Sequence, residues 1–508
     1  MKRSFLILGL VMIVISLSSA LRAESLFRVR EATDNYIDIE FDLKDYESIL
    51  TEMDGTRYYR LFHPDAAYLM NEGKPELPFF TTSIAIPNTG TARIDDIRVL
   101  DREIQDDILI FPSQGDDVAS ITESEFVIDD LFYLKDKVYP EETCRIGTPA
   151  IMRDIRFVSI TLTPFRYNPY SQELEINRNI SLRVEFDQTQ VGENELTRPL
   201  RKLSRSYETI YQSVLLNYND FISPNWEYQS RSILVVHHHS ALLEPVIDMY
   251  VEWKRQKGFE ITATSTSGMT TATAIKNYIQ NAYDTWEIPP EYVILIGGGS
   301  GSFAIPTFPG YPSLASDHPY SLLEGGDDIS DVFVGRLPIY NTEHLMTIWN
   351  KIRNYEKTPY TIDTDWYRHA LLYGSPGGWG ISTLFTPKYV KEQMLLFNED
   401  FSFSEVYYAP FATQINNALN QGTFMFNYRG YYGFYYDWTS SSPNLNNGLK
   451  LPYAFFLTCH TLDYNNSSTS ETERFVNLGT PIASKGGIAA MGHNTGDSKT
   501  AYNNALSG

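Results

Sequence analysis

Two apolar segments in the last fifth of the chain each end in polar or reactive residues. Residues 422–433 read GTFMFNYRGYYG and residues 451–460 read LPYAFFLTCH, so the second apolar run ends at Cys459. Short apolar runs of this kind are typical of buried strands in a parallel sheet. Because open α/β folds build their sites at the carboxyl ends of such strands, we expect a thiol there, with a partner at the end of a neighbouring strand.

The two segments resemble the histidine and cysteine blocks of the gingipain family of cysteine peptidases, in the caspase-like clan. Asn427, Tyr428 and Gly430 match a block in which a strand ends in Asn-Tyr-x-Gly-His-Gly, and Cys459 falls at the position of the family's nucleophile. The sequence departs from the block at one position, because Tyr431 stands where the family has its catalytic histidine. The resemblance implies a caspase-like fold and a nucleophilic cysteine.

The first part of the chain has the pattern of a β-rich domain. Its apolar residues alternate with polar ones or are β-branched, between turns of Pro, Gly and Asn. Much of residues 60–220, including GKPELP at 73–78 and TPFRYNP at 163–169, is similar to the propeptide that precedes gingipain catalytic domains. We therefore predict a gingipain-type propeptide domain over residues 24–225.

From residue 232 the pattern changes to alternating strands and helices, which predicts a gingipain-like α/β peptidase domain over residues 232–508. It should contain two parallel-sheet subdomains, at about 232–358 and 366–508. The expected strands are residues 232–238, 259–266, 292–297, 370–375, 423–428, 453–459 and 487–491. The expected helices are residues 241–257, 271–286, 342–355, 387–398, 413–421 and 471–478. The stretch 298–338 reads as irregular, and a helix that begins near residue 500 suggests a chain truncated at its C-terminus.

The N-terminus has the pattern of a secretory signal peptide over residues 1–23. Lys2 and Arg3 precede an apolar run at residues 5–17, and small residues follow at 18–20. The run is too short for a membrane span, and no later stretch reaches the ~18 apolar residues that a spanning helix needs. The formal net charge of −22 disfavours nucleic acid as a partner. We expect a protein that is secreted or held at the cell surface and that acts on protein or peptide substrates.

Cys144 and Cys459 are the two cysteines of the chain. They lie in different predicted domains, so we expect two free thiols rather than a disulfide. A free cysteine is often a buried apolar side chain, but the strand end and the family match favour a nucleophile at Cys459. A thiol with the ordinary pKa of about 8.5 then needs a nearby base or cation.

Three histidines are candidates for the base that Tyr431 replaces. A phenol with a pKa of about 10 is protonated at neutral pH, so Tyr431 acts as a donor rather than a base. His493 ends the next strand at the same edge of the sheet and is the best placed candidate. His460 adjoins Cys459, but neighbours on an extended chain point to opposite faces, so their pairing requires a turn. His318 lies in the loops of the first subdomain.

Aromatic residues gather directly after the histidine block. Tyr432 and Trp438 are candidates for the wall of a substrate pocket, since aromatic rings offer much contact area. Asp437 or Asp317 could select a basic side chain. The alternative is that these rings pack over the end of the sheet.

Clustered carboxylates at Asp327, Asp328 and Asp331 suit calcium. The segment that follows, VFVGR at 332–336, is similar to a gingipain segment, and the resemblance implies a calcium-stabilised enzyme that requires no other cofactor. A solvated loop is the alternative. The three histidines at 237–239 alternate between the faces of a strand and are not expected to converge on one metal ion.

Two function classes fit these patterns. The first is a secreted, gingipain-like cysteine endopeptidase, made as a zymogen, that hydrolyses peptide bonds through Cys459. The second is a catalytically impaired pseudopeptidase that acts as a surface binding or assembly module. Cys459 and the propeptide-like region favour the first, whereas Tyr431 favours the second.

Overall fold

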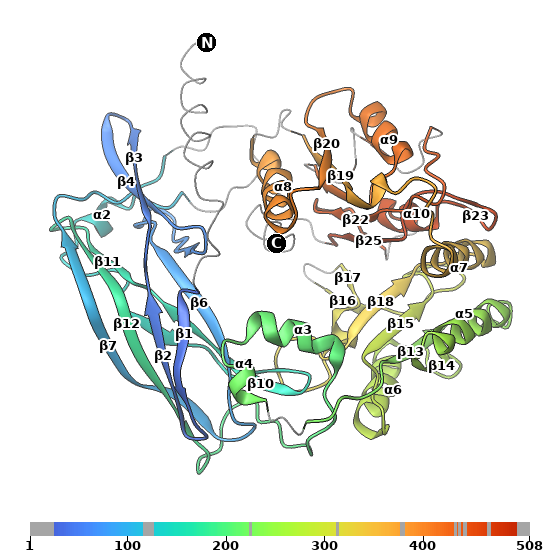
Figure 1. The fold of residues 1–508 in the computed structure, drawn as a ribbon, viewed down its shortest axis with the longest axis horizontal. Helices are drawn as coiled ribbons and strands as arrows, with labels where there is room; N and C mark the ends of the chain where they lie inside the picture. Colours follow the sequence, from blue (N-terminus) through green and yellow to red (C-terminus); the bar gives the residue numbers. More distant parts are fainter. Residues whose placement is uncertain are drawn as a thin grey trace.

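The structure is a computed structural model that describes residues 25–114, 126–222, 226–310, 314–375, 381–430, 434, 438–439, 444–464 and 469–494. Figure 1 shows a strand-rich N-terminal part, coloured blue to green, beside an α/β part, coloured yellow-green to red. The predicted signal peptide and the helix expected near residue 500 lie outside the described residues.

The N-terminal domain consists of antiparallel strands in two sheets. One sheet has the order β1-β2-β12-β11, with β7 paired to β12. Its strands are β1 (Phe27–Ala32), β2 (Tyr36–Asp42), β7 (Thr91–Gln105), β11 (Phe165–Asn168) and β12 (Glu173–Asp187). The other has the order β5-β6-β10-β8, with β9 paired to β10. Its strands are β5 (Ala67–Tyr68), β6 (Pro78–Ala85), β8 (Cys144–Ile146), β9 (Ala150–Met152) and β10 (Ile155–Leu162).

Alternation along the strands explains how the two sheets pack. On β2, Ile37, Ile39 and Phe41 are buried and share one core with side chains of β6, β10 and β12. The remaining elements are a hairpin and three short helices: β3 (Glu47–Met53), β4 (Thr56–Phe62), α2 (Asp130–Tyr133), α3 (Arg205–Val214) and α4 (Tyr218–Phe221). The predicted β-rich propeptide domain is confirmed in its fold class.

The first subdomain of the α/β part has a parallel sheet of order β14-β13-β15-β18. Its strands are β13 (Ser232–His237), β14 (Glu260–Ser265), β15 (Tyr292–Ile296) and β18 (Phe333–Leu337). Its helices are α5 (Glu244–Gln256), α6 (Ala272–Thr285) and α7 (Thr342–Lys357). Every residue of β13 is buried, because α5 and α7 pack on one face of the sheet and α6 on the other. Short pieces complete it: β16 (Phe308–Pro309), β17 (Ala315–Ser316) and η2 (His318–Tyr320).

The second subdomain has a parallel sheet of order β20-β19-β21-β22-β25. Its strands are β19 (His369–Gly374), β20 (Ser402–Val406), β21 (Met425–Arg429), β22 (Tyr453–Phe456) and β25 (Ala489–Gly492). Its helices are α8 (Phe385–Phe397), α9 (Phe411–Gln421) and α10 (Glu471–Asn477). Aromatic side chains fill the core on the side of α9 and α10. Short pieces complete it: η3 (Asp365–Arg368), η4 (Ile381–Leu384), β23 (Gly479–Thr480) and β24 (Ala483–Ser484).

The prediction of two parallel α/β subdomains is confirmed, but it missed two strands. β18 was read as irregular because Gly335 and Arg336 interrupt its apolar pattern. β20 lies at the edge of the second sheet, and its sequence SFSEV carries little apolar signal.

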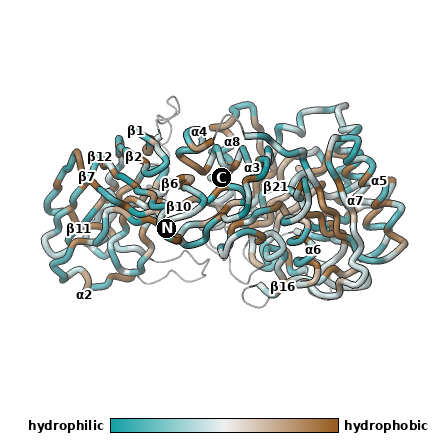
Figure 2. Tube along the Cα trace, turned by 90° about the horizontal axis from the view of Figure 1, so that it is seen from below, coloured by the Kyte–Doolittle hydropathy of each residue, from teal (hydrophilic) through white to brown (hydrophobic). Residues whose placement is uncertain are grey.

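Figure 2 shows apolar (brown) stretches inside both parts of the molecule, alternating with hydrophilic (teal) stretches. Among the described helices, none combines the length and apolar content of a membrane span.

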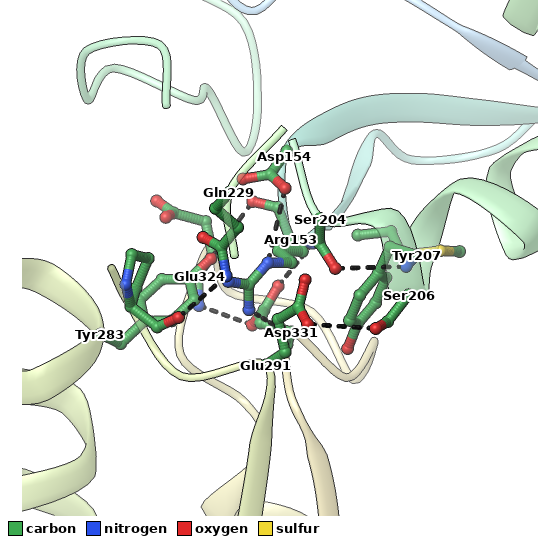
Figure 3. A network of polar contacts seen from close by, with 12 residues as sticks. Arg153, Asp154, Ser204, Ser206, Tyr207, Gln229, Tyr283, Glu291, Glu324 and Asp331 are labelled. Atoms are coloured by element: carbon green, nitrogen blue, oxygen red, sulfur yellow. Dashed lines mark hydrogen bonds and ion pairs between the residues drawn. The ribbon is translucent and has the colours of Figure 1, made fainter. Parts of the chain in front are cut away.

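A hairpin of the N-terminal domain inserts Arg153 into the α/β part. Arg153 joins β9 to β10 with a φ of 53° and is 1% exposed. Its Nη1 donates to the carbonyl oxygens of Pro290 and Asp331, at 2.9 Å each, and its backbone N–H donates to Asp331 Oδ1 at 2.8 Å. The guanidinium also faces the rings of Tyr207 and Tyr283. Figure 3 shows Arg153 above the strands that it caps.

This contact defines the edge at which the N-terminal domain docks. Glu291 directly precedes β15 and Asp331 lies two residues before β18, so both mark the amino ends of the first sheet. Glu291 accepts a hydrogen bond from Ser206 at 3.1 Å, and Arg198 contacts Glu324 at 2.6 Å. The N-terminal domain therefore docks against the edge of the sheet opposite to the carboxyl ends of its strands.

Replacing the buried guanidinium should weaken this docking. Arg153→Met removes a charged donor and leaves two buried carbonyls unpaired, and hydrogen bonds to charged groups contribute roughly 1.5–3 kcal/mol each. We expect the free energy of unfolding, measured by urea denaturation, to fall by about 3 kcal/mol. The matched control is Arg145→Met on β8, where the side chain is exposed. Equal effects of the two changes would contradict the anchoring role of Arg153.

Candidate active site

Cys459 lies at the carboxyl edge of the second sheet, as the sequence predicted. β22 ends at Phe456, and its parallel neighbours β21 and β25 place Tyr428 and Gly492 level with that residue. The residues that follow these three strands therefore meet at one edge. Cys459 is 7% exposed and free of disulfide bonding.

The chain turns at Cys459 instead of continuing as a strand. His460 has a φ of 58°, in the left-handed region. The Thr461 hydroxyl lies 2.9 Å from the carbonyl oxygen of Phe456 and 2.8 Å from that of Thr458. Thr458 Oγ1 in turn accepts from the backbone N–H of Gly430 at 2.7 Å. The turn is thus hydrogen-bonded within itself and to the end of β21.

His460 is paired with a carboxylate inside this turn. Its Nδ1 lies 2.8 Å from Asp463 Oδ2, and both side chains are partly exposed. Asp463 Oδ1 is buried and has no hydrogen-bond partner in the described part of the chain. The turn that the sequence argument required for His460 is therefore present.

His493 lies beside the same turn, directly after β25. Its backbone N–H donates to Thr461 Oγ1 at 3.0 Å, and its carbonyl accepts from the backbone N–H of Leu462 at 3.0 Å. Its Nε2 is buried and has no hydrogen-bond partner among the described residues. Burial, and then the cation of Arg429, lower the pKa of His493. His493 therefore lies at the predicted edge of the sheet, whereas its role as the base stays a prediction.

The first subdomain supports the chain that follows Cys459. Gly299 packs so closely on Tyr464 that an added Cβ would overlap the carbonyl oxygen of Tyr464. The guanidinium of Arg336 lies 5.6 Å from the centre of the Tyr464 ring. Arg336 also forms a two-pronged pair with Asp317, at 2.7 Å for each contact. Asp317 is therefore engaged in a partly buried pair, and neighbouring His318 is exposed.

The predicted substrate-pocket residues have different outcomes. Tyr431, Tyr432 and Asp437 lie outside the described residues. Trp438 is 2% exposed, and its indole N–H donates to Asn416 Oδ1 at 2.9 Å. Its ring packs in the aromatic core of the second subdomain, so the structure places Trp438 in the core.

The carboxylates proposed for calcium bind backbone N–H groups. Asp327 accepts from the N–H groups of Ile151 and Ile329, at 2.8 Å each. Asp331 accepts from the N–H groups of Arg153 at 2.8 Å and of Leu323 and Glu324 at 2.7 Å. Burial raises the pKa of Asp331 to about 7.

These oxygens already have donors, so the residues present do not fit a calcium ion. Asp328 is exposed and lies apart from this set. Within the described ranges, no group of three or more His, Cys, Asp or Glu side chains could hold a metal ion, the histidines at 237–239 included.

Sequence reasoning did not single out Thr461, Asp463 or Tyr464. For Asp463 a signal was available, because a carboxylate three residues after His460 can meet it once the chain turns. Tyr464 gave no local signal, since its contacts with Gly299 and Arg336 come from the other subdomain.

A parallel sheet that presents a cysteine at its carboxyl edge, next to a β-rich domain, is the arrangement of a caspase-like cysteine peptidase with a propeptide. The chain belongs to peptidase family C25, whose family model matches residues 227–507, and the C25 propeptide model matches residues 28–221.

The chain is similar to gingipain R2 of Porphyromonas gingivalis, with 27% identity over 78% of this chain and 55% of the relative. It is also similar to Lys-gingipain of the same organism, with 23% identity over 77% of this chain and 23% of the relative. A crystal structure of the Arg-specific cysteine proteinase gingipain R matches with 24% identity and a TM-score of 0.45, over 51% of this chain and 61% of that chain. The chain thus spans about half the length of the first of these relatives.

Close packing at Gly299 yields a prediction about the turn that carries Cys459. Gly299→Ala should displace Tyr464, five residues after Cys459, because the added methyl overlaps its backbone. We expect a loss of about 1–3 kcal/mol in the free energy of unfolding, the usual cost of overpacking, and a changed rate of Cys459 alkylation. Gly326→Ala is the control, since an added Cβ there meets no atom within 4 Å. An equally small effect at both positions would show that the contact does not support the turn.

Proposed function

We propose that this chain is an exported cysteine endopeptidase, made as a zymogen, with Cys459 as its nucleophile. The observation that carries the proposal is the position of Cys459, in a hydrogen-bonded turn where three parallel strand ends meet. In such a site a thiolate attacks the peptide carbonyl, and a base returns the proton to the leaving amine. Membership of a cysteine peptidase family implies protein or peptide substrates.

The base is the open part of this proposal. Tyr431 stands at the family's histidine position, and a phenol is protonated at neutral pH. In this proposal another histidine accepts the thiol proton. His460 lies in the turn that carries Cys459, and His493 lies beside it.

The propeptide match over residues 28–221 is the basis for proposing that the enzyme is made in a latent form. In the described part of the chain, the hydrogen bonds that join residues 25–222 to the two subdomains reach residues 283–331. These contacts lie at the amino ends of the first sheet, away from Cys459. Removal of the domain is proposed to take place by cleavage between residues 222 and 232, at the predicted domain boundary.

The second candidate is a pseudopeptidase that keeps the fold and uses it as a binding or assembly module. Tyr431 is the observation that favours it, because the replaced histidine is the family's base. A measurement of peptide cleavage distinguishes the peptidase from the pseudopeptidase.

The two thiols should differ strongly in reactivity. Burial, with the nearby charge of Glu142, raises the pKa of Cys144 to about 12. Because the thiolate is the reactive form, a thiol of ordinary pKa should react with iodoacetamide roughly 1,000-fold faster at pH 7 than one with a pKa near 12.

We expect mass spectrometry of the native protein to find the label on Cys459. Cys459→Ala should abolish rapid labelling, whereas Cys144→Ala should leave it unchanged. A native protein in which Cys459 resists the reagent would overturn its assignment as the nucleophile.

Peptide cleavage tests turnover and latency together. The intact chain and the chain cut near Arg231 are incubated with a mixed peptide library, with Cys459→Ala as the inactive control. We expect cleavage that rises after the cut, since a propeptide restrains its enzyme until it is removed. Equal rates before and after the cut would make the N-terminal part a permanent domain. Cleavage seen in Tyr431→His but not in the natural chain would support the pseudopeptidase.

A further inference from the structure

The turn that holds Cys459 also holds an imidazole and a carboxylate in hydrogen-bond contact. We propose that His460 is the base that serves Cys459 and that Asp463 orients it, in place of the family histidine that Tyr431 replaces. This inference rests on the proposed role of Cys459 as the nucleophile.

The backbone removes the main objection to a base that adjoins its nucleophile. On an extended strand the side chains of Cys459 and His460 would point to opposite faces of the sheet. The strand ends at Phe456, however, and His460 has a φ of 58°, so the two residues share a turn. The contacts of Thr461 with Phe456 and Thr458 hold that turn.

Asp463 fixes which nitrogen of His460 is available. A carboxylate accepts hydrogen bonds, so the Nδ1 atom 2.8 Å from Asp463 Oδ2 carries the proton. Nε2 is then the basic nitrogen. The other oxygen of Asp463 is buried with no hydrogen-bond partner in the described ranges. A positioned carboxylate of this kind stabilises the imidazolium that forms during catalysis.

His493 has a cation near it, whereas His460 contacts a carboxylate. It is buried, the Arg429 cation acts on it, and both effects disfavour its protonated form. No carboxylate contacts its ring among the described residues, since Nε2 has no partner and no ion pair joins it to an acid. Its backbone instead holds Thr461 and Leu462, which makes His493 a structural neighbour of the turn.

The charged groups around the turn come from five elements, one of which is α10. The Thr472 hydroxyl of α10 donates to the carbonyl oxygen of Thr461 at 2.6 Å, and neighbouring Glu473 accepts from Tyr340 at 2.7 Å. Arg429 ends β21 and His493 follows β25, while Arg336 lies on β18 and its partner Asp317 precedes η2. Arg336 and Asp317 neutralise one another through two contacts of 2.7 Å. Tyr464 lies between that pair and the turn. Asp463 is a carboxylate within hydrogen-bond distance of His460, at 2.8 Å.

The proposed chemistry conserves atoms and charge. His460 Nε2 accepts the thiol proton, and the Cys459 thiolate forms a bond with the carbonyl carbon of the substrate. The C–N bond then breaks as the imidazolium returns the proton to the leaving amine, leaving a thioester. Water, deprotonated by the same nitrogen, attacks the thioester and releases the carboxylic acid and the thiol.

The pH dependence of Cys459 alkylation tests the role of His460. Iodoacetamide labelling of the full chain is measured from pH 5 to 10, in the natural protein and in His460→Asn, Asp463→Asn, His493→Asn and His369→Asn. Asparagine is the chosen replacement because it tolerates the left-handed backbone of His460. His369 is the matched control, since it begins β19 at the opposite edge of the same sheet and is bonded to Ser402 and Ser404.

We expect an apparent thiol pKa below 8.5 in the natural protein. His460→Asn should raise it to about 8.5, the ordinary value, and slow alkylation at pH 6.5 by about tenfold or more. Asp463→Asn leaves the imidazole of His460 in place, so it should also raise the apparent pKa of the Cys459 thiol, but by less than His460→Asn does. A merely structural role would lower the melting temperature without moving the apparent pKa, so the melting temperature is recorded for each variant.

Three outcomes would overturn the inference. The first is an unchanged profile in His460→Asn, or, if that variant does not fold, in Asp463→Asn. The second is a shift produced by His493→Asn alone. The third is an ordinary thiol pKa in the natural protein. Failure of Cys459 to react at any pH would instead overturn the proposed function itself, so the two failures are distinguishable.

Discussion

The parallel alignment of β21, β22 and β25 is the constraint on which the candidate site depends. Parallel strands end at the same edge of a sheet, so the residues after Tyr428, Phe456 and Gly492 are brought together although they are up to 64 positions apart in the chain. The Thr461 hydroxyl then links the ends of β22 and β25, through the carbonyl of Phe456 and the N–H of His493. Cys459 keeps its position because both its own strand and the next one hold the turn.

The docking of the N-terminal domain uses the other end of the α/β part. Burying a charged group as large as the Arg153 side chain requires compensating contacts. Here the carbonyls of Pro290 and Asp331 accept from Nη1, and Asp154 Oδ2 lies 3.5 Å from Nε. Asp331 has a raised pKa because it is buried in the same place, although backbone N–H groups bond to it. Of the three carboxylates that resembled a calcium cluster, Asp327 and Asp331 therefore serve to join two domains.

The fold was largely readable from the sequence, because apolar periodicity is a local property. Buried β13 and amphipathic α6 lie close to the residues where their patterns place them. The sequence does not predict β18 and β20, because an edge strand needs fewer apolar residues. These two segments are strands because they pair in parallel with β15 and β19. Trp438 likewise had the composition of a pocket wall, but the rings around it in the folded chain make it a core residue.

The sequence by itself determined the family, the two-part architecture and the place of Cys459 at a strand end, because motifs and apolar runs are contiguous in the chain. It also predicted that Tyr431 stands where the family has its catalytic histidine. Only the tertiary structure decided that Cys459 lies in a turn and that Asp463 meets His460 at 2.8 Å. Only it decided that Arg153 docks at the amino ends of the first sheet, away from Cys459. These features depend on backbone dihedral angles and on contacts between distant segments, and neither is a property of a local pattern.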